Sequence, residues 1–435
     1  MSLSDIPNFF LSRSGDGLDL HQSVSPPPTS KPRGRRVLVV GGGVTGLTTA
    51  WALLDAGYDV TIVAERWADP QNRITSNVAG ALWEWPPAVC GKHTDRVSLC
   101  NSKRWCMTSY RLFDRLLEIL PPDDYIDHGV RMRMSNFFFD RLLEDMPDPG
   151  QAKKFLEIAS QVDIRGVRRD PNIILEHGVD ISAGIVDAYQ HLAPVIDTDR
   201  YMTWLRLVVS SKGASFETRR ISGDLLTQER DLLSKYNAVA IVNATGLSGV
   251  ELAGDASVYP LRGALIRVVN DGKKFPKVTE ALAVTHDETR GEDEDIVFIV
   301  PRNDNTLILG GIAQPHQWAL DLTLESPEIQ RMRARCNQFV PGLANAEYDP
   351  EAALVQGLRP FRKSNVRVER EPRGGGTSRI IHSYGQGGAG FSLSFGCASD
   401  VLGLVQELEQ GITPSRMGMS RPNAHGHDVH AYSSL

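Results

Sequence analysis

Short apolar runs recur along the chain and predict buried strands. The first two cover residues 36–40 and 60–64, on either side of a segment of helical composition. The remaining runs predict strands over 214–221, 238–244, 263–269, 296–300, 307–312 and 379–384. Apolar residues at helical spacing predict helices over 102–120, 199–209 and 392–409, whereas residues 121–195 are mixed and follow neither period. This alternation of strands and helices indicates an α/β protein.

The first predicted strand ends in a glycine-rich turn. Gly41, Gly43 and Gly46 have the spacing GxGxxG, in which the first glycine permits a tight bend and the second lets a pyrophosphate approach the backbone. The third glycine lets the following helix pack closely against the strand. That helix begins near Val44 and Thr45, where unpaired N–H groups can bind phosphates. The spacing therefore favours a nucleotide-binding unit over a glycine-rich loop without a ligand.

Two further features bear on the ligand. Glu65 follows the second strand, where a carboxylate can accept hydrogen bonds from a ribose diol. A second glycine-rich turn, residues 385–390, follows the strand near the end of the chain. Because an adenine nucleotide needs only the first turn, the second one favours a longer ligand that is held at both ends. A flavin dinucleotide meets that demand, and an unrelated packing turn is the alternative.

Composition narrows the class of protein. The chain has 435 residues, a formal net charge of −6 and no basic stripe, so we expect no nucleic-acid partner. No wholly apolar run reaches the roughly 18 residues that span a bilayer, and the first ten residues lack a secretory signal. We therefore expect an intracellular protein that does not bind a membrane. The odd number of cysteines, five, and their spacing predict reduced thiols and no metal site. The chain ends in Ser433-Ser434-Leu435, which is similar to the peroxisomal address, so the location is cytoplasmic or peroxisomal.

Several separate motifs resemble those of the D-amino acid oxidase family of FAD-dependent oxidoreductases. They are residues 74–83, 242–246, 261–263, 307–312 with Trp318, 357–360 and 384–392. The resemblance implies non-covalent FAD, a small-molecule substrate and O2. It also implies removal of hydride from the α carbon of a D-amino acid or related amine, giving an imine, then a keto acid and H2O2. A homodimer is left open.

The resemblance also implies a fold. We expect a Rossmann-like FAD-binding domain interleaved with a substrate domain built on a mixed, largely antiparallel sheet. We assign residues 36–87, 195–260 and 355–412 to the first domain and 88–194 and 261–354 to the second. Residues 1–35 are expected to form a poorly ordered N-terminal arm and 413–435 a C-terminal tail.

Carried over by position, the family's cofactor-binding residues fall on the glycine turns and the segments beside them. The resemblance assigns them to Gly41, Gly43, Val44, Thr45, Gly46, Glu65, Arg66, Thr75, Ser76, Gly80, Ala81, Leu82, Arg220, Ile221, Thr245, Gly246, Gly387, Gly388, Ala389, Gly390, Phe391 and Ser392.

The substrate residues match the family only in part. We assign Arg359, Phe298, Gln386 and Glu84 to the catalytic site. Arg359 occupies the position of the arginine that binds the substrate carboxylate, and Gln386 lies in the C-terminal flavin loop. Phe298 stands where the family has a tyrosine, and the acidic loop 291–295 lacks the second tyrosine of the family's lid. Glu84 lies just beyond the flavin-contacting segment, where it either faces a cationic group or is an exposed carboxylate.

These departures leave alternatives open. Loss of both tyrosines would fit a specialised FAD-dependent oxidase or dehydrogenase of a biosynthetic intermediate. A protein that binds FAD without turnover is a third hypothesis. The acidic loop is either a solvated turn or a feature that disfavours acidic substrates by repulsion of like charge. Ala313 stands where the resemblance implies an arginine in oxidases of acidic D-amino acids, so an acidic substrate is disfavoured.

Overall fold

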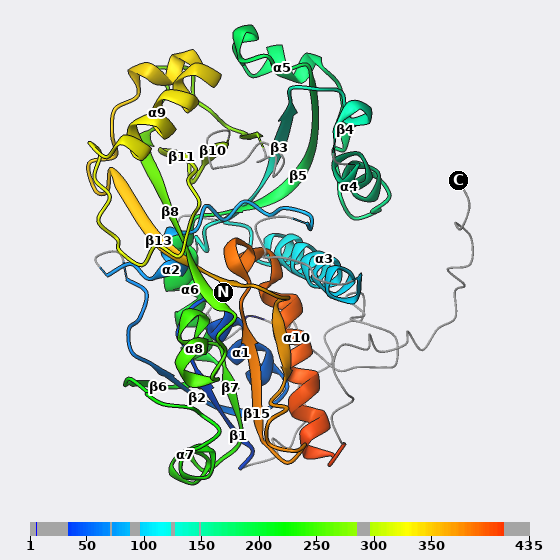
Figure 1. Ribbon diagram of the computed structural model, residues 1–435, viewed down its shortest axis with the longest axis vertical. Helices are drawn as coiled ribbons and strands as arrows, with labels where there is room; N and C mark the ends of the chain where they lie inside the picture. Colours follow the sequence, from blue (N-terminus) through cyan, green and yellow to red (C-terminus); the bar gives the residue numbers. More distant parts are fainter. Residues whose placement is uncertain are drawn as a thin grey trace.

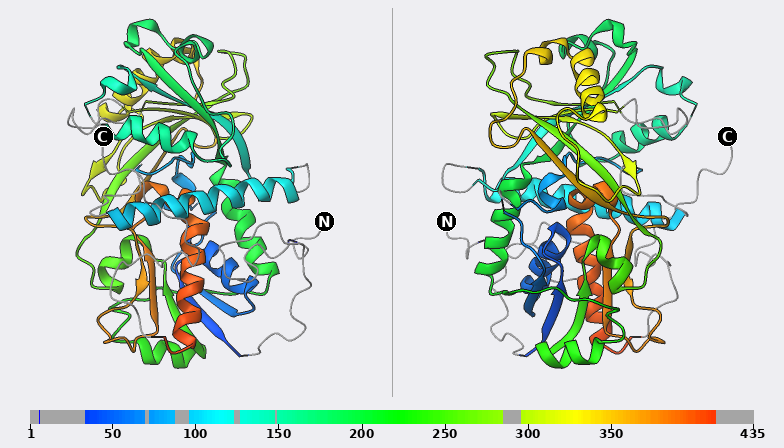
Figure 2. Two further views of the ribbon diagram at one scale, coloured as in Figure 1. Left: turned by 90° about the vertical axis from the view of Figure 1, so that its right-hand side faces the viewer. Right: turned by 60° about the vertical axis from the view of Figure 1, so that its left-hand side comes forward.

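The structure, a computed structural model, describes residues 6, 34–69, 72–87, 96–122, 127–147, 149–284 and 296–412 (Figure 1). The predicted acidic loop 291–295, the tail 413–435 and nearly all of the arm 1–35 lie outside the described residues. Two sheets make up the protein, one at each end of the long axis (Figures 1 and 2). The expected α/β fold with a Rossmann-like domain and a second sheet is confirmed.

The first sheet has six strands in the order β14-β15-β7-β1-β2-β6. Its central strands are parallel, and only β14 is antiparallel to its neighbour. The strands are β1 (Arg36–Val40), β2 (Asp59–Ala64), β6 (Ser215–Thr218), β7 (Ala238–Asn243), β14 (Arg367–Arg370) and β15 (Ile380–Tyr384). The carboxyl ends of the parallel strands meet at one edge, which is where ligands bind in such sheets.

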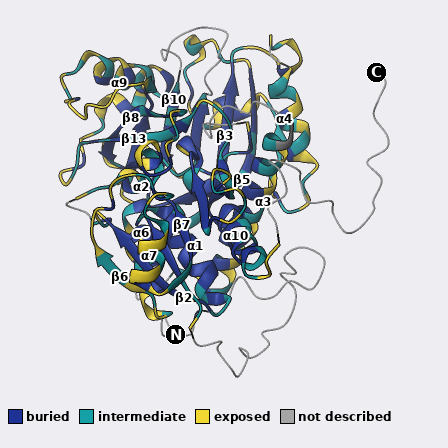
Figure 3. Ribbon diagram, turned by 60° about the horizontal axis from the view of Figure 1, so that its bottom comes forward, coloured by how far each residue is buried: buried dark blue, intermediate teal, exposed yellow. Residues whose placement is uncertain are grey.

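Helices cover this sheet on both faces, and the main core lies between them. The helices of the protein are α1 (Val44–Asp55), α2 (Thr75–Val78), α3 (Arg96–Ile119), α4 (Gly150–Ala159), α5 (Asn172–Glu176), α6 (Thr198–Ser211), α7 (Glu229–Tyr236), α8 (Gly249–Leu252), α9 (Pro327–Phe339) and α10 (Gly390–Glu409). Trp51 of α1 packs edge-to-face against Trp204 of α6 and Phe395 of α10, so these three helices share one core. Figure 3 shows that the strands are mainly buried, whereas α7 and α9 carry exposed residues.

The second sheet has nine strands in the order β12-β8-β11-β10-β9-β3-β5-β4, with β13 also paired to β8. All its pairs are antiparallel except β3 with β9. The strands are β3 (Val130–Phe139), β4 (Arg168–Arg169), β5 (Asp187–Ile196), β8 (Val258–Val269), β9 (Ala281–Val284), β10 (Val297–Pro301), β11 (Thr306–Gly310), β12 (Gln314–Pro315) and β13 (Leu354–Arg362).

Most predicted elements are present, with shifted ends. The strand expected over 214–221 stops at Thr218, and the helix expected from residue 102 begins earlier, at Arg96. The proposed domain boundaries at residues 195, 261 and 355 fall inside β5, β8 and β13, and β13 is hydrogen-bonded to the second sheet along its whole length. The division into two domains stays a prediction.

One segment of the described chain, Gly387–Glu409, is long and apolar enough to cross a membrane. The segment is not a wholly apolar run, because it includes the charged residue Asp400. Because 67% of its apolar window is buried inside the protein, it has the character of a core helix. None of the four described cysteines forms a disulfide, and no cluster of metal-ligating side chains occurs among the described residues.

Candidate active site

The first glycine turn is shaped by close backbone contacts. Gly41 has a φ of +121°, a conformation that favours glycine. A Cβ atom on Gly41 would lie 2.3 Å from the carbonyl oxygen of Ala244, and one on Gly46 would lie 2.0 Å from the carbonyl oxygen of Gly41. Both positions therefore require glycine, as the sequence motif predicts.

The helix after this turn presents its N-terminus to the segment that follows β2. The backbone N–H of Val44 donates to the Oγ of Ser76 at 3.1 Å, and Ser76 Oγ also lies 3.2 Å from the position of a Cβ on Gly43. The first turn of α1 carries no acidic residue, and Thr45 beside it is half-buried. A helix N-terminus of this kind attracts an anion such as a pyrophosphate.

The second glycine turn meets the first. Gly390 begins α10, and a Cβ on Gly390 would lie 3.5 Å from a side-chain carbon of Val44. Gly387 has a φ of +57°, Gly388 is exposed, and Ala389 is buried. The two turns, more than 300 residues apart, therefore lie side by side, in the arrangement expected for one long ligand.

One residue assigned to this turn points away from it. The side chain of Phe391 packs in the main core against Tyr201, with ring centroids 5.8 Å apart. Any contact that Phe391 makes with a cofactor would therefore come from its backbone. Ser392 is buried. Gln386 is buried as well, and its amide nitrogen lies 3.5 Å from the Oγ of Ser383, so its catalytic assignment stays a prediction.

Charged residues gather at the ends of β2 and β6. Arg219 continues beyond β6 and donates its backbone N–H to the carbonyl of Ala64. This pairing brings Arg220 to 3.5 Å from Glu65 in an ion pair that is exposed on both sides. Arg66 is exposed beside them, and Ile221 is buried. The predicted adenosine-binding residues are thus together at one edge of the first sheet.

A third turn lies between the two sheets. Thr245 and Gly246 follow β7, and Gly246 has a φ of +58°. A Cβ on Gly246 would lie 3.5 Å from Pro360, the residue after Arg359 in β13. The predicted cofactor turn therefore contacts the strand that carries the predicted substrate arginine.

The guanidinium of Arg359 lies over the neighbouring strand β8 of the second sheet. A Cβ on Gly263 of β8 would lie 2.5 Å from the Cζ of Arg359, so the guanidinium lies directly over Gly263. One of its nitrogens donates to the carbonyl of Ile312 at 3.0 Å. Gly357, two residues earlier on the same face of β13, meets Val78 of α2.

Phe298 lies on the same face of this sheet. Its ring would meet a Cβ on Gly80 at 2.6 Å and one on Gly310 at 3.6 Å. Leu82 and Phe298 pack against a shared small apolar cluster, and Thr75 donates to the carbonyl of Leu358 at 3.2 Å. Segment 75–82 therefore covers the face from which Arg359 and Phe298 project.

The backbone of this covering segment is fixed from several sides. Ala81 has a φ of +51°, and its carbonyl accepts a hydrogen bond from the N–H of Ile196. Arg302, which the sequence analysis missed, donates to the carbonyls of Ala79 at 2.6 Å and Ile196 at 2.7 Å. Burial lowers the pKa of Arg302 to about 10. A charged residue immediately after a buried strand was the available signal for this contact.

Glu84 is not an exposed carboxylate, and the cationic group that it contacts belongs to the protein itself. Its side chain is 17% exposed and lies 2.5 Å from the Nζ of Lys154, which is 3% exposed. Lys154 belongs to α4 and also donates to the carbonyl of Pro87 at 3.3 Å. The cationic group opposite Glu84 is therefore one of the protein's own side chains, and its catalytic assignment stays a prediction.

These observations fit an FAD molecule. The first glycine turn leaves no room for side chains at Gly41 and Gly46, and the N-terminus of α1 suits the pyrophosphate. The exposed pair of Glu65 and Arg220 suits the adenosine end. Segment 75–82 covers the face of the second sheet that carries Arg359.

Comparison with known proteins agrees with this geometry. The family profile of FAD dependent oxidoreductases (DAO) matches residues 36–402. The chain is 30% identical to a D-amino-acid oxidase of Streptomyces coelicolor over 376 residues, which cover 86% of this chain and 97% of that protein. It is also 30% identical to a D-amino-acid oxidase of Rubrobacter xylanophilus, with the same coverage.

Solved structures share the fold. Glycine oxidase from Geobacillus kaustophilus aligns with a TM-score of 0.66 at 18% identity, covering 88% of this chain and 99% of that one. Glycine oxidase from Bacillus cereus aligns with a TM-score of 0.63 at 14% identity, with coverage of 88% and 99%. The family match and the arrangement of the three turns together show that this chain belongs to the DAO family of FAD-dependent oxidoreductases, enzymes that act on CH–NH2 groups with FAD as cofactor.

Proposed function

We propose that this protein oxidises a D-amino acid or a related amine that carries a carboxylate, with Arg359 binding the carboxylate. The observation that carries the proposal is the position of the guanidinium over Gly263, on the face covered by segment 75–82. An arginine can bind a carboxylate through two parallel hydrogen bonds, which a lysine cannot reproduce. The D-amino-acid oxidases among its relatives support this substrate class.

The residues proposed to hold FAD come from all three turns and from segment 75–82. FAD, when bound, supplies a two-electron acceptor that O2 reoxidises to give H2O2, while the substrate becomes an imine and then a keto acid. The backbone of the turn 41–46 and the N-terminus of α1 bind the pyrophosphate, and Glu65 with Arg220 meets the adenosine end. Arg302 fixes the covering segment through the carbonyl of Ala79.

The protein's main contribution to the reaction is orientation. Arg359 fixes one end of the substrate, and the ring of Phe298 limits its position against Gly80. Phe298 has no hydroxyl and can neither donate a hydrogen bond nor carry a proton. Holding the reacting groups in a productive geometry can lower a barrier by several kcal/mol without any acid or base.

The same phenylalanine favours a second candidate function. Its ring lies against Gly80 without a polar group, so the carboxylate has one partner fewer than in the usual family site. A specialised oxidase of a larger biosynthetic intermediate would depend less on a hydroxyl group at residue 298 to bind its substrate. The proposed homodimer and the cytoplasmic or peroxisomal location stay predictions, and Ser433-Ser434-Leu435 lies outside the described residues.

The direct test is Arg359→Ala with Arg359→Lys beside it. We expect both variants to bind FAD as the wild type does. Their Michaelis constant for the substrate should rise by about a hundredfold, because the paired charge-assisted hydrogen bonds to the carboxylate are lost. Arg333→Ala is the control, because Arg333 on α9 likewise donates to backbone carbonyls, those of Leu343 and Ala346. An unchanged Michaelis constant for Arg359→Ala with a carboxylate substrate would sink the proposal.

A further inference from the structure

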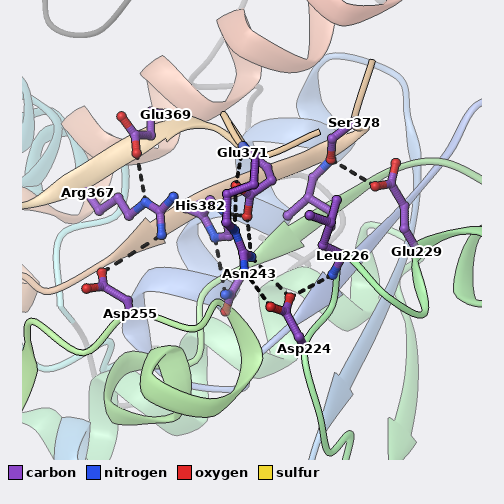
Figure 4. Close-up of polar contacts among 12 residues, drawn as sticks. Asp224, Leu226, Glu229, Asn243, Asp255, Arg367, Glu369, Glu371, Ser378 and His382 are labelled. Carbon is purple, nitrogen blue, oxygen red and sulfur yellow. Dashed lines mark hydrogen bonds and ion pairs between the residues drawn. The ribbon is translucent and has the colours of Figure 1, made fainter. Parts of the chain in front are cut away.

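A chain of buried polar side chains runs behind the turn at Thr245. Asn243 is the last residue of β7 and His382 lies opposite it in β15, in register across the parallel pair (Figure 4). The amide nitrogen of Asn243 lies 3.2 Å from the Nδ1 of His382, and the Nε2 of His382 lies 3.1 Å from Glu371. All three side chains are almost completely buried.

The first link fixes the orientation of the Asn243 amide. Its oxygen accepts hydrogen bonds from both the hydroxyl of Thr245, at 2.7 Å, and the backbone N–H of Thr245, at 3.3 Å. The amide nitrogen must therefore face His382, where it can only donate. Nδ1 of His382 has to be an acceptor and cannot carry a proton.

The second link fixes the other side of the ring. With Nδ1 as acceptor, the single proton of a neutral imidazole is on Nε2, which donates to the carboxylate of Glu371. Glu371 is held in turn by the guanidinium and backbone N–H of Arg373, which also contacts Asp224. Every donor in this hydrogen-bonded series from Thr245 to Glu371 thus meets an acceptor only while His382 is neutral.

The surroundings of His382 favour that neutral form. Burial lowers the pKa of His382, the hydrogen bond to Glu371 raises it, and the charge of Arg367 lowers it, with a net fall below the ordinary value. Glu369 is the other charged group near the ring, and Tyr384 faces it edge-on at 5.6 Å between centroids.

We propose that His382 is a positioning residue for the cofactor: through the amide of Asn243 it holds the turn at Thr245 and Gly246 in the conformation that binds FAD. This inference rests on the proposed cofactor site. Protonation of Nδ1 would set two donors against each other and turn the Asn243 amide, so that its nitrogen faces the N–H of Thr245. FAD affinity then falls when His382 becomes charged.

The turn held in this way also reaches the substrate arginine. Gly246 follows Thr245 and lies against Pro360, which is next to Arg359. A shift of the turn would therefore be felt at both the cofactor and the substrate positions. No sequence pattern indicates this role, because Asn243 and His382 are separated by 139 positions and each has the pattern of an ordinary strand residue.

The test measures FAD dissociation constants for the full-length protein by flavin fluorescence, as the pH is lowered from about 8 to about 4, because the pKa of His382 lies below the usual histidine value. Thermal melting of each apo-protein reports folding separately. We expect the wild type to bind FAD less tightly at the acidic end. His382→Leu, which removes the acceptor, is expected to bind about tenfold more weakly at the alkaline end, the effect of one lost hydrogen bond.

His382→Asn is the matched control, because its amide oxygen can take the place of Nδ1 and does not titrate. It is expected to keep FAD affinity within about threefold of the wild type and to lose the acid dependence. If His382→Leu does not fold, Asn243→Asp serves instead: its carboxylate accepts from both Thr245 and a charged His382, so FAD affinity should persist at acidic pH.

The outcomes separate the two proposals. A wild type that does not bind FAD at any pH contradicts the proposed cofactor site. A wild type that binds FAD, together with wild-type affinity in His382→Leu or an unaltered acid dependence in His382→Asn and Asn243→Asp, overturns the positioning role of His382 alone.

Discussion

The contact between Gly263 and Arg359 allows the guanidinium to be moved without being removed. In Gly263→Ala the new Cβ would lie 2.5 Å from Cζ and 2.6 Å from both terminal nitrogens of Arg359. Ordinary contacts between carbon atoms are about 3.5–4.0 Å, so the guanidinium must shift by about 1 Å. Because it is the far end of a flexible side chain, the shift costs little folding stability.

A misplacement of about 1 Å in a group that orients the substrate can lower the rate about a hundredfold. We therefore expect kcat/KM of Gly263→Ala to fall by about that factor for the preferred D-amino acid, with an unaltered FAD dissociation constant and Tm. The assay is steady-state H2O2 formation, with calorimetry for Tm. The control is Gly342→Ala, whose new Cβ would meet only Phe275 and Pro276 at ordinary distances of 3.5 and 3.9 Å. Wild-type kcat/KM in Gly263→Ala would refute the assignment of Arg359 as the carboxylate anchor.

Three further results follow from the buried charges and thiols. Lys154→Met leaves Glu84 without its cation and should lower the free energy of unfolding by about 1–3 kcal/mol, measured with urea; a second change, Glu84→Leu, should restore part of the loss, and full independence of the two changes would contradict the pair. For Glu371, burial would raise the pKa, but hydrogen bonds from His382 and Arg373 hold it well below its usual value of 4.5. Its contribution to stability is therefore present above about pH 4.5 and lost as the pH falls below it, so Glu371→Gln should flatten the acid limb of a urea-unfolding profile; an acid limb identical to that of the wild type would contradict this. Among the described cysteines, Cys100 is exposed, whereas burial raises the pKa of Cys336 to about 11. Iodoacetamide at neutral pH should therefore label Cys100 before Cys336, as followed by peptide mass spectrometry. Earlier labelling of Cys336 would contradict its burial.

The parts of the site that could be predicted from the sequence are those held by local rules. Gly41 and Gly46 are required because strand, turn and helix follow one another directly, so their spacing alone carries the information. Arg359 was found through a short motif of the same kind. The motif also gave the neighbour Pro360, although not its contact with Gly246.

The parts that could not be predicted depend on pairing between distant segments. Lys154 reaches Glu84 from 70 positions away, and neither residue has a local pattern that reveals the other. β3 and β5 lie in the stretch of mixed pattern, and both are interior strands of the second sheet, where polar residues such as Asn136 and His191 are buried among apolar ones. Lone glycines such as Gly263 acquire a meaning only when β8 and β13 are in register.

Anaerobic reduction of the bound flavin tests the central claim most directly. Under anaerobic conditions, the purified protein would be mixed with a panel of D-amino acids, their L-enantiomers and the corresponding amines that lack a carboxylate. The flavin absorbance band at about 450 nm would be followed. The account predicts that this band is bleached by at least one D-amino acid and neither by its L-enantiomer nor by the corresponding amine without the carboxylate. Bleaching by the amine without a carboxylate, or by L-amino acids alone, would contradict it.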